Sequence, residues 1–247
     1  MFRSGNRSLP APWQDVFGPL KTPGKDGSVV VGQIGQSLDG RVATLAGHSH
    51  YINGADGLAH LHRLRALVDA VVVGIGTALA DDPQLTVRRV TGPHPARVVI
   101  DPGGKLPRSA RMLADDGTRR VVITAEGRRP DLPHGVEMLP LKLTDGSIPP
   151  DAIVAGLRGL GFRRILIEGG ANTVSRFLSA GCLDRLHIVV APVVIGSGPA
   201  GLSLAPIATM DQALRFPVRT HNLGPEVLFD CDLSAQRACG GDAKKST

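Results

Sequence analysis

The sequence predicts an α/β protein with a mainly parallel sheet. Runs rich in Val and Ile recur along the chain without regular alternation of polar and apolar residues, as expected of strands buried on both faces. Helical patterns lie between several of these runs, and such alternation is typical of βαβ units. Aromatic residues make up 3% of the chain, so aliphatic side chains must form most of the core.

Eight strands are expected, and most of them are continuous apolar runs such as "SVVVGQI" and "DAVVVG". Their ranges are 28–34, 69–74, 96–101, 119–124, 136–141, 163–168, 186–195 and 226–233. Apolar residues at helical spacing predict helices over 54–68, 149–161 and 172–183. No helix separates the last two strands, and parallel strands need a long crossover, so we expect an antiparallel C-terminal edge.

One domain, residues 28–233, is expected between two polar ends. Residues 1–27 are rich in Gly, Pro, Ser and Lys and predict a flexible arm. Residues 234–247 are small and polar and predict a disordered tail.

Charge and composition narrow the class of partner. The net charge is +6, but the arginines are scattered rather than clustered. This pattern favours a phosphorylated small molecule over nucleic acid. The cysteines and histidines lack metal-ligand spacing, so we expect no metal. No apolar run approaches the roughly 20 residues that span a bilayer, and no secretory signal is visible. We therefore expect a cytoplasmic protein without membrane contact.

The segment 71–89 begins like a dinucleotide-binding turn. The fingerprint fails because Leu79 occupies the place of its third glycine. Thr77 still opens a short helix whose N-terminus favours anions. Asp81 and Asp82 precede a proline, and capping or turn formation explains them more readily than catalysis does.

The segment "ILIEGGANTV" raises two questions. Glu168 ends a strand that should be buried, and a lone buried carboxylate is costly without a partner. Gly169 and Gly170 then fit either a tight turn or a cradle for phosphate. The residues alone leave both readings open.

Together these segments resemble a known family. "SLDGRVAT", "HRLRALVDAVVVGIGTALADDPQLTVR", "ILIEGGANTVSRFL" and "LDRLHIVVAPVVIGSG" are similar to the reductase domain of bacterial riboflavin biosynthesis, over roughly residues 29–232. The resemblance implies a dihydrofolate-reductase-like fold, NADPH as cofactor and commonly a homodimer. It also implies reduction of 5-amino-6-(5-phospho-D-ribosylamino)uracil to the ribitylamino compound, with hydride delivered to C1′ of the sugar.

The resemblance also implies site residues. NADPH contacts are implied at Gly35, Tyr51, Gly76, Thr77, Asp81, Gly169, Gly170, Ala171, Asn172 and Thr173. Substrate contacts are implied at Ser49, Arg65, Leu85, Arg88 and Glu168. Arg65 and Arg88 suit a ribose phosphate, because guanidinium binds phosphate bidentately. Glu168 suits the N–H edge of a uracil ring. Asp81, Glu168 or water could supply the proton.

Several positions depart from the family pattern. Gln33 stands where many members carry Lys, Gln36 replaces a hydrophobic residue, and Pro102 replaces a serine near the adenosine of the cofactor. Arg128 or Arg129 could contact the 2′-phosphate instead. The departures leave open a reductase of another pteridine-like or pyrimidine substrate, of dihydrofolate type. A non-catalytic nucleotide-binding protein is the alternative from another class. The zinc motif of the deaminase that often accompanies this domain does not occur, so we expect a stand-alone reductase.

Overall fold

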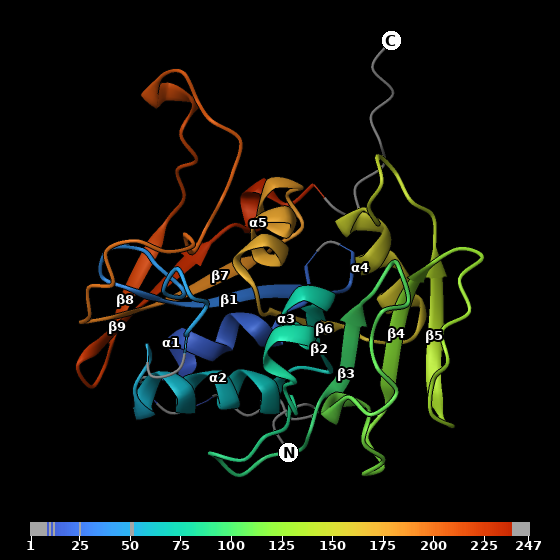
Figure 1. Cartoon of the computed structure of the whole chain (residues 1–247). Coiled ribbons are helices and arrows are strands. Elements are labelled where there is room, and N and C mark those ends of the chain that lie inside the picture. Colours follow the sequence, from blue (N-terminus) through green and yellow to red (C-terminus); the bar gives the residue numbers. More distant parts are fainter. Residues whose placement is uncertain (1–8, 10, 12, 25, 50–51, 239–247) are drawn as a thin grey trace.

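A computed structural model describes residues 9, 11, 13–24, 26–49 and 52–238. Nine strands form one sheet in the order β5-β4-β3-β2-β6-β1-β7-β9-β8 (Figure 1). The strands are β1 (Val29–Ser37), β2 (Ala70–Gly74), β3 (Ala96–Ile100), β4 (Arg120–Ala125), β5 (Val136–Leu141), β6 (Arg164–Glu168), β7 (Arg185–Ala191), β8 (Val218–Leu223) and β9 (Glu226–Asp232). The pairs from β5 to β7 are parallel, whereas β9 pairs antiparallel with both β7 and β8. The predicted α/β architecture with an antiparallel C-terminal edge is confirmed.

Helices cover both faces of the sheet. They are α1 (Trp13–Phe17), α2 (Ala55–Leu67), α3 (Ile75–Asp81), α4 (Pro150–Gly159) and α5 (Ala171–Ser179). Alternate residues of the strands point to opposite faces. On one face Val30 and Ile165 pack with apolar residues of α4 and α5. On the other, Val31 and Leu166 pack with α1, α2 and α3.

Two strand predictions differ from the structure. The strand expected over 186–195 ends at Ala191, because Pro192 has no N–H to continue a ladder. Strand β8 was not predicted. Its sequence, "VRTHNL", is mostly exposed at the sheet edge and therefore lacks an apolar pattern.

The prediction of a flexible arm over 1–27 is wrong for much of its described part. After α1, residues Gly18–Lys21 form the 3₁₀ helix η1, and Val16, Phe17 and Leu20 are buried in the core beside α2. The ring of Phe17 stacks on that of His60 with centroids 5.4 Å apart. These few apolar side chains outweigh the Gly- and Pro-rich composition around them.

The start of the predicted disordered tail is also ordered. Residues Ser234–Gln236 form the 3₁₀ helix η4. Arg237 forms ion pairs with Asp184 and, at 2.9 Å, with Asp26. Residues 239–247 lie outside the described part of the chain.

The parallel strands place their carboxyl ends at one edge of the sheet, where ligands commonly bind in α/β proteins. Gly35 in β1, Gly74 at the end of β2 and Glu168 at the end of β6 meet there. None of the helices in the described ranges is long and apolar enough to cross a membrane. The cytoplasmic location stays a prediction.

Candidate active site

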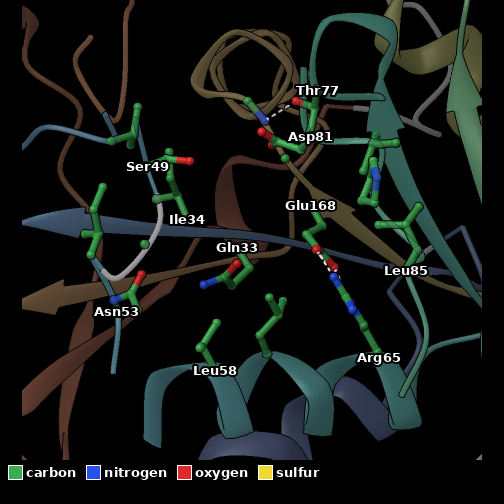
Figure 2. Close-up of a pocket in the computed structure, with 18 of the residues that line it drawn as sticks. Gln33, Ile34, Ser49, Asn53, Leu58, Arg65, Thr77, Asp81, Leu85 and Glu168 are labelled. Carbon is green, nitrogen blue, oxygen red and sulfur yellow. Dashed lines mark hydrogen bonds and ion pairs between the residues drawn. The ribbon is translucent and has the colours of Figure 1, made fainter. Parts of the chain in front are cut away.

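A cavity of about 600 Å³ lies at the carboxyl ends of β1, β2 and β6 (Figure 2). Helix α2 forms one wall, and the segments after α3 and β6 form others. Eleven of the residues predicted for the site line it: Gly35, Ser49, Arg65, Thr77, Asp81, Leu85, Arg88, Glu168, Gly169, Gly170 and Ala171. The predicted residues thus lie together at one cavity, and their roles stay a prediction.

Four predicted residues are not among the lining residues. Tyr51 lies outside the described residues. Gly76, Asn172 and Thr173 do not line the cavity. The side chain of Thr173 packs against Gly74 instead, since a Cβ atom at position 74 would lie 2.5 Å from its Oγ1.

Glu168 has a buried partner, which is Arg65. Nε of Arg65 donates to Oε2 of Glu168 at 2.7 Å, and Nη2 donates to Oε1 (Figure 2). Nη1 donates to the carbonyl oxygen of Thr86 at 2.9 Å. The pair answers the question of the buried carboxylate. Three of the five N–H groups of Arg65 thus have protein acceptors, which leaves two for the predicted contact with a phosphate.

Three further arginines surround the mouth of the cavity. Arg88 and Arg89 follow β2 and α3 along the chain, and Arg111 begins the 3₁₀ helix η2 (Arg111–Leu113). In the described part of the chain, no carboxylate lies within ion-pair distance of any of the three side chains. Partial burial and the charges of Arg65 and Arg89 lower the pKa of Arg88. An anion bound here would relieve this repulsion.

The pKa of His62 is lowered by burial and by the same cluster of positive charges. Burial, followed by the charges of Arg65 and Arg88, lowers its pKa to about 3. The ring is therefore neutral near pH 7. Its Nδ1 accepts a hydrogen bond from the backbone N–H of Arg88 at 3.0 Å, so the ring hydrogen lies on Nε2. This bond fixes the backbone that carries Arg88.

The glycine pair after β6 is required by local geometry. Gly169 has φ of +111°, which side-chain-bearing residues rarely adopt. The backbone N–H of Gly170 donates to Oγ1 of Thr77 at 2.8 Å. This bond joins the first turns of α3 and α5 at the cavity (Figure 2). The arrangement opens the N-terminus of α5 toward the cavity, and such a terminus suits the phosphates of a nucleotide.

The two aspartates at the C-terminal end of α3 have different surroundings. Asp82 takes a left-handed backbone conformation with φ of 37° and its Oδ1 accepts a bond from the backbone N–H of Arg111 at 2.8 Å. The turn-forming role of Asp82 is thus confirmed. Asp81 instead lines the cavity and is exposed. Leu85, fully buried with φ of 55°, adds a strained backbone at the cavity wall.

Sequence reasoning did not assign several lining residues, among them Gln33, Asn53 and Arg111. Gln33 pairs in register with Glu168 on the neighbouring strand, so both side chains lie on one face of the sheet. Its spacing of two from Gly35 was a usable signal. For Asn53 the sequence held no signal, because its partner Glu226 lies 173 positions away.

Comparisons with known proteins agree with this geometry. The family model of the RibD C-terminal domain matches residues 28–228. A 2,5-diamino-6-ribosylamino-4(3H)-pyrimidinone 5′-phosphate reductase of Methanothermobacter thermautotrophicus is 32% identical over 202 residues, which are 78% of this chain and 93% of that protein. The riboflavin biosynthesis protein RibD of Aquifex aeolicus is 33% identical over 199 residues, covering 78% of this chain but 54% of that protein.

Solved structures show the same fold. The deaminase/reductase of Thermotoga maritima superposes with a TM-score of 0.71 at 26% identity, over 89% of this chain and 59% of that one. The riboflavin biosynthesis reductase Rib7 of Saccharomyces cerevisiae gives a TM-score of 0.73 at 21% identity, over 92% and 99% of the two chains. The chain spans about half the length of the RibD relatives and nearly all of the archaeal one. This chain belongs to the family of the RibD C-terminal domain.

Proposed function

We propose that the protein is an NADPH-dependent reductase of riboflavin biosynthesis, acting on 5-amino-6-(5-phospho-D-ribosylamino)uracil. The observation that carries the proposal is a single cavity with three kinds of recognition. An oriented carboxylate, Glu168, faces the space for a pyrimidine. Arginines that pair with no carboxylate of the described residues suit a phosphate. The joined first turns of α3 and α5 suit a pyrophosphate.

The cofactor would lie along the glycine turn. NADPH, when bound, supplies the hydride that reduces C1′ of the sugar. Thr77, Gly170 and Ala171 would hold its pyrophosphate. Arg128, in the turn after β4, lies near the Pro102 segment, since the N–H of Ala125 bonds to the carbonyl oxygen of Pro102 at 3.2 Å. This turn is a suitable place for the 2′-phosphate that distinguishes NADPH from NADH.

The substrate would lie against α2 and β6. Arg65 fixes the plane of the Glu168 carboxylate. The remaining lone pairs of the carboxylate can then accept hydrogen bonds from N–H groups of the pyrimidine. Arg88 would bind the 5′-phosphate. Reduction at C1′ also consumes a proton, for which Asp81, which lines the cavity, and water are the candidate donors. The contribution of the protein is then mainly orientation of the two reactants.

A second candidate substrate is the 2-amino compound, 2,5-diamino-6-ribosylamino-4(3H)-pyrimidinone 5′-phosphate. The match along 93% of the archaeal relative favours it. Oxidation of NADPH by the purified protein, measured with each compound in turn, decides between the two. NADPH binding without oxidation by either compound would instead support a nucleotide-binding protein.

The family resemblance suggests a homodimer, which we include in the proposal. The segment between β7 and β9 exposes several large apolar side chains that a second copy could cover: Val193, Val194, Leu204, Ile207, Met210, Leu214 and Val218.

A further inference from the structure

We propose that Asn53 is a ligand-binding residue, and that Glu226 positions its side chain. Asn53 precedes α2 and lines the cavity (Figure 2). Its carboxamide lies directly against β1. A Cβ atom at position 35 would lie 1.7 Å from Oδ1 of Asn53. The absence of a side chain at Gly35 therefore makes room for this carboxamide.

Glu226 determines which way the carboxamide points. Oε1 of Glu226 accepts bonds from Nδ2 of Asn53 at 2.8 Å and from the backbone N–H of Gly54 at 2.9 Å. Oε2 accepts a bond from the backbone N–H of Gly57 at 2.8 Å. A carboxylate can only accept, so the amide nitrogen of Asn53 must face it. The amide oxygen is then on the side of Gly35, which also lines the cavity.

The carboxylate of Glu226 has little freedom to move. The residue is 1% exposed and begins β9. Its charge lies at the N-terminus of α2, where the helix dipole favours an anion. Gly57 leaves room for it, since a Cβ atom there would lie 2.6 Å from Oε2. A side chain held by such an anchored group is already ordered before a ligand binds.

The oxygen of Asn53 is the available end. It accepts no hydrogen bond from the described residues, whereas Nδ2 is engaged. Its natural partner is an N–H donor of a bound molecule. Both reactants of the proposed function carry such a group, namely the carboxamide of nicotinamide and the amino groups of the pyrimidine. The identity of the donor, but not the orientation of Asn53, rests on that function.

Binding titrations of Asn53→Ala with NADPH and with the phosphoribosylaminopyrimidine show which of the two ligands donates the hydrogen bond to Asn53. Loss of one hydrogen bond should weaken the binding of one ligand by about 2- to 10-fold and leave the other within error. Gly35→Ala, which displaces the carboxamide of Asn53, should weaken the binding of the same ligand. Asn222→Ala, an exposed asparagine of β8, is the matched control. Unchanged affinity for both ligands in Asn53→Ala would overturn the proposal. Absence of turnover in the wild-type protein would overturn only the proposed function.

The positioning role of Glu226 is tested in two backgrounds. Glu226→Gln places an amide N–H opposite one of the N–H groups at the start of α2, so it should lower Tm with or without Asn53. If Glu226 acts through Asn53, Glu226→Gln weakens binding of the ligand whose affinity Asn53→Ala lowers. In the Asn53→Ala background, the same change then has no further effect on that affinity. Equal losses of affinity in both backgrounds would show that Glu226 has only a structural role.

Discussion

Glu168 and Arg65 form a buried ion pair at the cavity, and the proposed function also assigns Glu168 to substrate recognition. The side chain of Glu168 is 11% exposed and that of Arg65 is 6% exposed. Removal of either one leaves the other as a buried charge without its partner. Breaking a buried pair from one side costs about 3–5 kcal/mol. We therefore expect Glu168→Gln to lower the free energy of unfolding by that order in urea titrations, and to lower kcat/KM while NADPH affinity changes little.

The matched control for this prediction is Glu137→Gln. Glu137 forms a bidentate pair with Arg119 at 2.8 Å, but both side chains are well exposed. Exposed pairs contribute about 0–1 kcal/mol. Similar losses of stability in the two variants would contradict the buried role of Glu168.

For single residues, the sequence showed that Glu168 is unusual but did not show what it contacts. Glu168 was a visible anomaly, because a carboxylate ends an apolar strand. Its partner Arg65 was assigned to the phosphate instead, since the contact joins α2 to β6 across 103 positions. The same limit hid Asn53, whose orientation depends on a carboxylate in the last strand.

Among the elements, the N-terminal segment is the least expected. Helix α1 places Phe17 between the rings of Trp13 and His60, and Arg63 of α2 lies 4.4 Å from the centroid of Trp13. Truncating a buried phenylalanine costs about 3–5 kcal/mol. We expect Phe17→Ala to lower the free energy of unfolding by this order in urea. Leu45→Ala, at a side chain that is 81% exposed, should have little effect. Equal stability of the two variants would show that α1 does not pack in solution.

How well the sequence predicts a strand or helix depends on its burial and its length. The central parallel strands are buried on both faces, so their apolar runs were unmistakable. Strand β8 is mostly exposed at an edge and has no such run. Helix α1 is too short for a periodic pattern, and tertiary packing rather than local propensity holds it.

For the whole molecule, buried histidines predict how stability depends on pH. Burial, then the charges of His187 and Arg63, lowers the pKa of His60, while the nearby Asp230 opposes the shift and His221 adds to it. Burial and the charges of Arg65, Arg88 and Arg89 lower that of His62 to about 3. The unfolded chain takes up protons as the pH falls below about 6.5, whereas the folded chain does not. Stability should therefore be fully present above that pH and decline below it.

Urea unfolding at about pH 7.5 and about pH 5 measures this decline. In His62→Gln, which keeps an acceptor near the backbone of Arg88, the decline should be shallower. An unchanged slope would mean that His62 is not held neutral by its surroundings.

The central claim is that one cavity brings a nicotinamide cofactor to a phosphorylated pyrimidine. Its most direct test is the oxidation of NADPH by the purified protein with the phosphoribosylaminopyrimidine and with the same compound lacking its phosphate. The structure predicts oxidation with the phosphorylated compound and a value of kcat/KM at least about 10-fold lower without the phosphate, because the arginines at the cavity mouth would lose their anion. No oxidation with either the uracil or the 2-amino form, or equal rates with and without the phosphate, would contradict it.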